Sequence, residues 1–325
     1  MKTDFDVLGI GNALMDVITP VEDDFLQTHG MDKGSMALID NDRLAGLGKA
    51  FSDLPETSQE IAGGSAANTM VGIAKMGVKT AYLAKIAEDS VGDRLAKGYA
   101  EAGLSFKSIR SQSGAPTGQC LIAVTKDGER TMNTCLGASP EFGKSDVSKD
   151  DIERSGTIYM EGYLFDTDDQ KAAFVKAAEI AQAAGRLVSL TLSDSFCVGR
   201  HRASFAQLVN NHVNILFANE EELLALAETD DLETAIAAFQ KDGLTLCVTR
   251  GAKGSLIIDG QTRHEVPVVA VDKVVDTTGA GDQYAAGVLA GRALGLSWAD
   301  AGFLGSKAAA EVISHYGARP EREIL

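Results

Sequence analysis

The sequence predicts an α/β protein with a mostly parallel sheet, helices on both faces in a three-layer sandwich, and a small β-sheet lid. Short β-rich runs alternate with longer helical patterns along most of the chain. This alternation is typical of parallel strands joined by helices. Two stretches, 12–45 and 106–135, break the alternation, and the second is β-rich with a hairpin turn expected at Lys126–Glu129.

The elements of the large domain follow in order along the chain. Strands are expected where β-branched and apolar residues gather, at Val7–Ile10, Thr80–Ala84, Thr157–Met160, Leu187–Leu192, Ile215–Ala218 and Leu244–Thr249. Helices are expected between them, at Ala66–Met76, Val91–Ala102, Asp168–Ala184, Arg202–Asn211 and Leu232–Lys241. The large domain would comprise 1–11, 46–105 and 136–325. The lid, over the ligand edge of the sheet, would comprise 12–45 and 106–135.

The charge balance excludes one broad class of partner. Of the 325 residues, 45% are apolar, which is enough for a substantial core. The 46 acidic and 30 basic residues give a formal net charge of −16. Nucleic acids and anionic membranes require a basic face, so neither is expected as a partner. A small anionic ligand remains compatible, because a few local donors can bind it.

Cysteine usage predicts a reducing compartment. No CxxC pair occurs, and most of the cysteines lie in apolar, strand-like stretches, as expected of buried reduced thiols. They are Cys120, Cys135, Cys197 and Cys247. We find neither an apolar signal core at the N-terminus nor a run of about 18 apolar residues. A cytoplasmic protein is therefore expected.

The segment Asp276-Thr-Thr-Gly-Ala-Gly-Asp282 is the most informative in the chain. The β-branched stretch Val268–Val275 precedes it and a small-residue helical run, Gln283–Ala290, follows it. A glycine-rich turn is thus expected between a strand and a helix start, where unpaired N–H groups bind anions. Asp282 would place a carboxylate beside that anion, as transfer of a phosphoryl group to a hydroxyl requires. An Asp in the first turn also stabilises a helix through its dipole.

A second glycine cluster, Gly63-Gly64-Ser65-Ala-Ala-Asn68, lies at the start of the helix expected at Ala66–Met76. Its glycines would let a polar ligand approach the backbone, and Asn68 offers both a donor and an acceptor. A tight turn with ordinary Ser/Gly capping explains the same residues. Taken alone, the cluster favours the turn.

Together the two segments resemble the paired signatures of the ribokinase-like (PfkB) sugar and nucleoside kinases. The first runs from Gly63 through Gly77 and the second from Asp276 through Gly287. Their order and separation also match the family. The resemblance implies the ribokinase-like fold, with a nucleotide-binding large domain and a lid that contributes to the substrate site.

Shorter motifs extend the resemblance over nearly the whole chain. Asn219-Glu-Glu-Glu222 resembles the family's N-x-x-E motif, and Thr249-Arg-Gly251 with Gly254 resembles its nucleotide loop. The opening segment Gly11–Val17 is similar to that of the adenosine kinases. Gly9-x-Gly11 superficially matches a dinucleotide fingerprint, but the third glycine is missing and that interpretation is rejected.

The resemblance implies roles on the phosphate side of the site. Asp282 would be the general base, with charge stabilised by the backbone N–H groups of Gly279, Ala280 and Gly281. ATP would contact Asn219, Glu222, Thr249, Gly251 and Gly254, and Glu222 would hold Mg²⁺ through water. Taken alone, Asn219 and Glu222 favour a helix N-cap with an acidic first turn, and the resemblance reverses that preference. Asp276 and the Thr278 carbonyl resemble a K⁺ site of some members.

The substrate side would be built around Asp16, whose two carboxylate oxygens suit a vicinal diol. The resemblance completes the sugar site with Asn12, Gly63, Gly64, Ser65 and Asn68. Apolar side chains would form the walls around an adenine ring, namely Met36, Leu38, Tyr163 and Phe196. Apolar residues such as the first two are more often core residues. Arg130, after the hairpin turn, would reach the phosphates when the lid closes, or simply face solvent.

These expectations lead to a functional hypothesis. The resemblance implies an ATP- and Mg²⁺-dependent kinase that phosphorylates the ribose 5′-hydroxyl of a purine nucleoside, adenosine first. A kinase acting on free ribose or fructose would keep Asp16 and Asp282 but replace the aromatic walls. A non-catalytic nucleoside-binding regulator is the third alternative, which the intact Asp282 and glycines disfavour. Either a monomer or a homodimer is compatible with the sequence.

Overall fold

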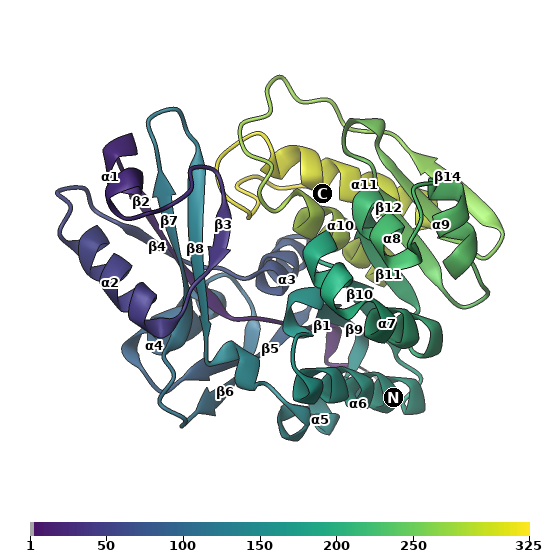
Figure 1. Cartoon of the computed structure of the whole chain (residues 1–325). Coiled ribbons are helices and arrows are strands. Elements are labelled where there is room, and N and C mark those ends of the chain that lie inside the picture. The colour runs from purple at the N-terminus through teal and green to yellow at the C-terminus, as the bar shows by residue number, and fades with distance from the viewer. Residues whose placement is uncertain (1–2) are drawn as a thin grey trace.

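The computed structural model describes residues 3–325 and contains two sheets of different size (Figure 1). The large sheet has nine strands in the order β14-β13-β12-β11-β10-β9-β1-β5-β6. They are β1 (Phe5–Ile10), β5 (Thr80–Ala87), β6 (Ser105–Ser111), β9 (Ser155–Glu161), β10 (Leu187–Thr191), β11 (Ile215–Asn219), β12 (Thr245–Thr249), β13 (Ser255–Asp259) and β14 (Thr262–Val266). All neighbours from β6 to β12 pair in parallel, and β13 and β14 add an antiparallel edge. The expected mostly parallel α/β fold is confirmed.

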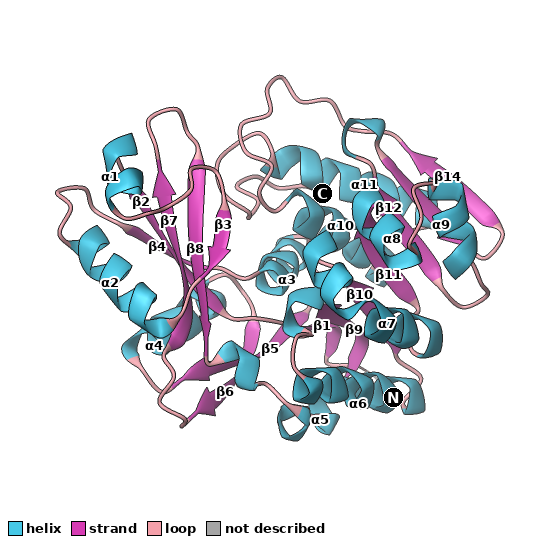
Figure 2. Ribbon diagram, viewed as in Figure 1, coloured by secondary structure: helices cyan, strands magenta, loops and turns pink. Residues whose placement is uncertain are grey.

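Helices cover both faces of the large sheet (Figure 2). One face carries α5 (Lys149–Glu153), α6 (Asp168–Ala183), α7 (Ser195–Asn211), α8 (Glu220–Ala227) and α9 (Leu232–Phe239). The other carries α3 (Ser65–Lys75), α4 (Ser90–Glu101), α10 (Ala280–Ala293) and α11 (Trp298–Val312). Among the described residues no helix is long and apolar enough to cross a membrane.

Strand β1 shows why the chain forms three layers. Leu8 and Ile10 are buried against the α6–α9 side, whereas Val7 is buried against the α3–α10 side. Successive side chains of a strand point to opposite faces, so a strand buried on both faces must be apolar throughout. This explains the unbroken apolar runs in the sequence.

The small sheet has the order β3-β8-β7-β2-β4 and forms the left part of Figure 1. Its strands are β2 (Leu14–Pro20), β3 (Met36–Leu38), β4 (Gln59–Ala62), β7 (Thr117–Val124) and β8 (Arg130–Gly137). Two helices, α1 (Asp23–Thr28) and α2 (Asn41–Ser52), pack against one face through a separate core that includes Leu26, Leu47 and Phe51. The opposite face is turned toward the large sheet.

Two sheet assignments differ from the sequence expectation. The stretch 106–111 belongs to β6 of the large sheet, because β6 pairs in parallel with β5 after the crossover helix α4. Conversely, β4 pairs antiparallel with β2, so 59–62 joins the small sheet together with the α2 residues beyond 45. Sheet membership depends on long-range pairing, which a local pattern does not reveal.

The segment before the glycine-rich turn also differs from the expectation. Val268–Val275 forms no strand; the sheet ends at β14. Val268 and Val274 are 50% and 53% exposed, and the Val275 N–H donates to the Ile313 carbonyl at 2.8 Å. The β-branched run is therefore a loop beside the end of α11, and it pairs with no strand of the sheet.

Candidate active site

The predicted site residues gather at the carboxyl edge of the parallel strands. Asn12 follows β1, and Asn219 and Thr249 end β11 and β12. Parallel strands end at the same edge of a sheet, where α/β proteins bind their ligands. Local sequence patterns on separate strands thus meet in one place.

Asp282 lies in the first turn of α10 and connects the two glycine segments. Its carboxylate accepts from the Ser65 hydroxyl at 2.6 Å and faces the Asn68 amide nitrogen at 3.5 Å. Burial raises the pKa of Asp282 to about 6, and these two hydrogen bonds partly oppose the shift. A carboxylate with this pKa is ionised at neutral pH and is well suited to accept a proton.

The two glycines of the turn have different structural roles. Gly279 caps α10 with φ of 79°, and a Cβ there would lie 2.6 Å from Ala318 Cα. A side chain at this position is excluded by both conformation and space. Gly281 is exposed, and a Cβ there would meet no atom within 4 Å. The helix start around Gly281 is therefore open to an approaching anion.

Asp16 is the second carboxylate of the site and projects from β2 toward the first glycine segment. A Cβ on Gly63 would lie 2.6 Å from the Asp16 carboxyl carbon, so only glycine allows this approach. Burial raises the pKa of Asp16 to about 6, while Arg319 and Arg130 oppose the shift. Gly64, with φ of 96°, follows in a conformation that favours glycine.

Strand register places the predicted lid residues on one face. Asp16 pairs with Cys120, Cys120 with Thr134, and Thr134 with Leu38. Directly paired residues point the same way. Met36 and Arg130 lie at even offsets from these positions along β3 and β8 and share the face. The small sheet thus directs the Asp16 carboxylate, two apolar side chains and an arginine toward the large sheet.

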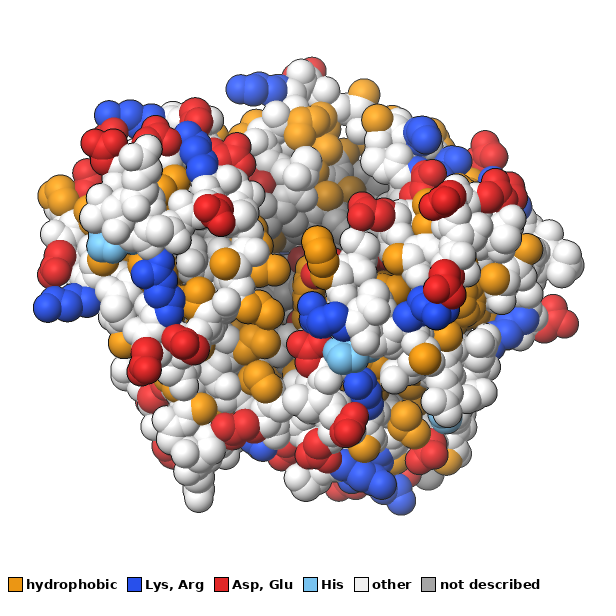
Figure 3. Space-filling model, viewed as in Figure 1, with side chains coloured by type: hydrophobic (Ala, Val, Ile, Leu, Met, Phe, Trp, Pro, Cys, Tyr) orange, Lys and Arg blue, Asp and Glu red, His pale blue; other side chains and the backbone are white. Residues whose placement is uncertain are grey.

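Apolar side chains line the central hollow between the two sheets (Figure 3). Met36 and Leu38 are 48% and 56% exposed, and Phe196, at the start of α7, is 80% exposed. Two hydrogen bonds to Ser193 hold Tyr163 in place. The Tyr163 hydroxyl donates to the Ser193 carbonyl at 3.3 Å, and the Tyr163 N–H donates to the Ser193 hydroxyl at 3.2 Å. Ser193 has φ of 73°. Exposed apolar side chains of this size indicate a surface made for an apolar partner.

Glu161 is a site residue that sequence reasoning missed. It is buried, and its carboxylate accepts from Asn12 Nδ2 at 3.0 Å and from the Ala66 N–H at 2.7 Å. Burial raises the pKa of Glu161 to about 7. The bonds leave Asn12 Oδ1 buried without a partner within the described chain, so this oxygen is available to a ligand. The signal was present: a carboxylate directly ends the strand expected at Thr157–Met160.

A profile of the pfkB family carbohydrate kinases matches residues 36–324. The chain belongs to the pfkB carbohydrate kinase family. A probable sugar kinase from Rhizobium etli CFN 42 has 41% identity and a TM-score of 0.89, covering 99% of this chain and 97% of that one. The adenosine kinase from Sinorhizobium meliloti has 41% identity and a TM-score of 0.85, covering 98% and 97%. Adenosine kinase from Saccharomyces cerevisiae is 26% identical over 302 residues, 87% of each chain.

Family membership makes the protein an ATP-dependent phosphotransferase that acts on a hydroxyl. It also confirms the resemblance first seen in the two glycine segments. Sugar and nucleoside kinases both occur among the relatives, so the family defines the reaction more closely than the substrate. ATP, usually with Mg²⁺, is implied for a pfkB kinase.

The pfkB N-x-x-E segment forms a helix cap in this structure. Asn219 Nδ2 and N both donate to the Glu222 carboxylate, at 2.7 and 3.0 Å, and the Glu222 N–H donates back to Asn219 Oδ1 at 2.8 Å. Burial raises the pKa of Glu222 to about 7. Both carboxylate oxygens therefore already accept hydrogen bonds, and the water-mediated Mg²⁺ role of Glu222 stays a prediction.

The nucleotide loop expected in pfkB kinases lies at the end of β12. Gly251 and Gly254 have φ of 55° and 80°, and a Cβ on Gly254 would overlap the Val266 carbonyl. Thr249 ends the strand beside them. The glycines are required for this tight connection between β12 and β13, and contact with ATP remains a prediction.

The K⁺ site that some pfkB kinases have is replaced here by an ion pair. Arg130 Nη1 lies 3.1 Å from Asp276 Oδ2, which also accepts from the Gly317 N–H at 3.1 Å. The Thr278 N–H and hydroxyl donate to Asp276 Oδ1 at 2.9 and 2.6 Å. Because hydrogen-bond donors surround both oxygens, Asp276 does not fit a K⁺ ligand in this structure. The same pair holds Arg130 next to Asp276, the first residue of the anion-binding turn, and contact of Arg130 with phosphate stays a prediction.

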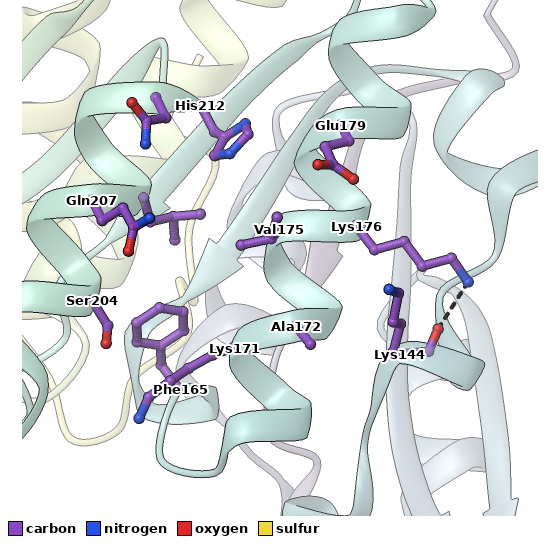
Figure 4. A pocket seen from close by; sticks show the side chains of 12 residues that line it. Lys144, Phe165, Lys171, Ala172, Val175, Lys176, Glu179, Ser204, Gln207 and His212 are labelled. Carbon is purple, nitrogen blue, oxygen red and sulfur yellow. Dashed lines mark hydrogen bonds between the residues drawn. The ribbon is translucent and has the colours of Figure 1, made fainter.

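A separate hollow between α6 and α7 has no part in this site (Figure 4). Lys144, Lys171, Lys176 and His212 contribute to its lining, and none of the predicted site residues does. Lys176 Nζ is held by the Lys144 carbonyl at 2.8 Å. Surface lysines of this kind are ordinarily solvated.

Proposed function

We propose that this pfkB kinase phosphorylates the ribose 5′-hydroxyl of a purine nucleoside, converting adenosine to AMP with ATP. The proposal is carried by the exposed apolar side chains of Met36 and Leu38, on the Asp16 face of the small sheet, and of Phe196, at the start of α7 beyond the carboxyl end of β10. A free sugar carries hydroxyls on most of its carbons, and an apolar lining offers these hydroxyls no hydrogen-bond partners. A purine presents an apolar face that stacks on aromatic and aliphatic side chains. The similarity to the Sinorhizobium meliloti adenosine kinase supports the same substrate class.

Asp282 is assigned the role of general base. It would accept the proton of the 5′-hydroxyl as the oxygen attacks the γ-phosphorus of ATP and the bond to ADP breaks. Ser65 and Asn68 hold its carboxylate, so the acceptor geometry is fixed before the substrate arrives. Phosphoryl transfer depends on positioning and charge stabilisation more than on covalent chemistry.

The open turn at Gly279–Gly281 is assigned to the transferring phosphoryl group. The N–H groups of Gly279 and Gly281 lie at the positive end of the α10 dipole, whereas the Ala280 N–H donates to the Thr277 carbonyl at 3.2 Å. Arg130 lies nearby through its contact with Asp276. Mg²⁺ would neutralise the ATP phosphates and retain most of its water. Closure of the small sheet would exclude water that would otherwise hydrolyse ATP.

The ribose is assigned to Asp16, Asn12 and Asn68. Asp16 would accept hydrogen bonds from the 2′- and 3′-hydroxyls, and the unpartnered Asn12 Oδ1 offers a further acceptor. Donors and acceptors that are already oriented lose little entropy when the sugar binds. The sugar is thereby held with its 5′-carbon toward Asp282.

The main rival is a kinase for a free sugar, which the similarity to the Rhizobium etli probable sugar kinase favours. A panel of adenosine, inosine, guanosine, cytidine, ribose and fructose separates the two, with ADP release measured by a coupled assay. We expect the highest kcat/KM with adenosine. Turnover of ribose or fructose without turnover of any nucleoside would reject the nucleoside assignment. Adenosine binding without ADP release from any acceptor would instead indicate a regulator.

Truncating Phe196 tests whether the apolar wall binds the base. Stacking of a base on an aromatic ring contributes about 1–3 kcal/mol, so Phe196→Ala is expected to raise the adenosine KM by roughly 5- to 150-fold. Residual turnover of ribose should not change, because ribose has no base. The measurement is steady-state kinetics with both acceptors.

A matched control for Phe196 is Phe303, which lies on α11 and is 41% exposed. The Lys307 ammonium lies 5.6 Å from the centroid of its ring. Phe303→Ala should leave the adenosine KM unchanged. An equal effect of both substitutions, or none from Phe196→Ala, would show that Phe196 does not contact the base.

A further inference from the structure

The segment after α11 packs against both glycine turns of the site and lies beside the small sheet (Figure 1). The Gly317 N–H donates to Asp276, and the Ala318 carbonyl accepts from Gln283 Nε2 at 2.9 Å. Ala318 also fills the space that a side chain on Gly279 would need. The path of this segment is therefore set by the same residues that shape the anion-binding turn.

Arg319, the next residue, reaches from this segment into the sugar site. Its Nε donates to Asn68 Oδ1 at 3.0 Å, and its Nη2 donates to the Ala62 carbonyl. The guanidinium lies 6.0 Å from the ring centroid of Tyr99, whose hydroxyl donates to the Gly63 carbonyl at 2.7 Å. Arg319 is thus held on three sides by residues next to the first glycine segment.

The contact with Asn68 fixes which way its amide points. A guanidinium has only donors, so the Asn68 atom that faces Arg319 must be the oxygen. The amide nitrogen is then directed toward Asp282, at 3.5 Å. Without Arg319, the Asn68 amide could rotate by about 180° and point its oxygen at the Asp282 carboxylate. The two oxygens would then repel each other, and Asp282 would lose a donor.

Arg319 also provides a positive charge opposite Asp16. No ion pair joins these two groups among the described residues, since their charged atoms are more than 4.0 Å apart. The charged or titratable groups around Asp16 are Arg319 from the C-terminal segment, Arg130 from β8, Cys120 from β7 and Tyr99 from α4. Arg319 has the larger effect of the two arginines on Asp16.

We propose that Arg319 is a positioning residue of the substrate site, which orients the Asn68 amide and keeps Asp16 ionised to accept the sugar hydroxyls. The inference rests on the proposed function in one respect, namely that Asp16 and Asn68 bind the sugar. It adds the C-terminal segment to a site otherwise built from the two glycine turns and the small sheet.

The experiment compares Arg319→Gln and Arg319→Lys with the wild-type chain, using adenosine and ATP over a range of pH. Arg319→Gln should raise the adenosine KM about 10- to 100-fold and leave kcat within a few-fold. The acid limb of kcat/KM should move to higher pH, because Asp16 loses a stabilising charge. The acid limb of kcat should stay in place, since it reports Asp282 in the substrate complex.

Arg319→Lys separates charge from geometry. A lysine ammonium restores the positive charge but not the two-directional fork. In Arg319→Lys, the acid limb of the kcat/KM pH profile should therefore return toward its wild-type position. The adenosine KM should stay elevated. Arg322→Gln is the control, because Arg322 lies three residues further along the same segment with an exposed side chain. Its KM and pH limb should equal those of the wild type.

Each outcome decides between named alternatives. Loss of kcat and of thermal stability in Arg319→Gln, with KM and the pH limbs unchanged, would make Arg319 a purely structural residue and overturn the proposal. Direct titration of adenosine without ATP gives the binding constant even for a variant that turns over poorly. If Asp16 variants also bind adenosine normally, the proposed function fails; if only Arg319 variants do, this inference alone fails.

Discussion

Replacing Asp282 by asparagine is expected to lower kcat by about 10²- to 10⁴-fold, the range for loss of a general base. Adenosine KM should change little, because asparagine keeps the size of the side chain and the contact with Ser65. The acid limb of kcat should also disappear. In the wild type the base is ionised above its pKa of about 6, so activity falls as the pH drops through that value. Steady-state kinetics from pH 5 to 9 measures both effects.

Asp300 provides a matched control for this substitution. It occupies the third position of α11, as Asp282 does in α10, and accepts from the Ser297 hydroxyl at 2.6 Å. Asp300→Asn should lower stability by about 0.3–1 kcal/mol through the helix dipole and leave kcat unchanged. If Asp282→Asn behaves like this control, the carboxylate serves only the helix and the assignment of the base is wrong.

The glycine motifs show what a sequence reveals about a site. Gly63, Gly64 and Gly279 could be predicted because close approach or positive φ restricts these positions to glycine, whereas Gly281 leaves the helix start open to an anion. Asp282 follows from its place beside them. Each of these signals is local, so a short segment is enough to recognise it.

Glu161 and Arg319 show where sequence reasoning ends. Glu161 acts on Asn12 from 149 positions away in the sequence, and Arg319 acts on Asn68 from 251 positions away. Neither lies in a glycine motif, and a lone arginine in a coil after a helix has no periodicity to mark it. Only the three-dimensional path of the chain reveals that they support the predicted residues. The same holds for β4 and β6, whose sheets were exchanged because pairing partners lie far away in sequence.

Asp276 shows why the motif alone could not decide the expected K⁺ site. The motif specifies the aspartate, but the partners of its carboxylate include Arg130 from β8 and the Gly317 N–H from the C-terminal segment. The motif therefore predicts the negative charge of Asp276. The group that neutralises this charge, Arg130, is distant in sequence and is known only from the structure.

Replacing Asp16 by alanine is expected to lower kcat/KM for adenosine by about 10²- to 10⁴-fold, because two hydrogen bonds to a charged group are lost. The loss should appear mainly in KM, since Asp16 would contact the ribose rather than the reacting oxygen. With 2′,3′-dideoxyadenosine, which keeps the 5′-hydroxyl but lacks the diol, Asp16→Ala should change kcat/KM little. Kinetics of both enzymes with both substrates forms a double-mutant cycle that isolates the interaction with the diol.

Glu60 serves as the control for Asp16, because it lies on the neighbouring strand β4 and its carboxylate forms a half-exposed pair with Arg94 at 2.6 Å. Such surface pairs contribute about 0–1 kcal/mol, so Glu60→Ala should leave both substrates unaffected. An equal loss on the dideoxy substrate would mean that Asp16 maintains the small sheet rather than binding the sugar. A loss confined to adenosine would instead show that the Asp16 carboxylate recognises the ribose diol. It would also explain the glycine at position 63, because a side chain there would displace that carboxylate.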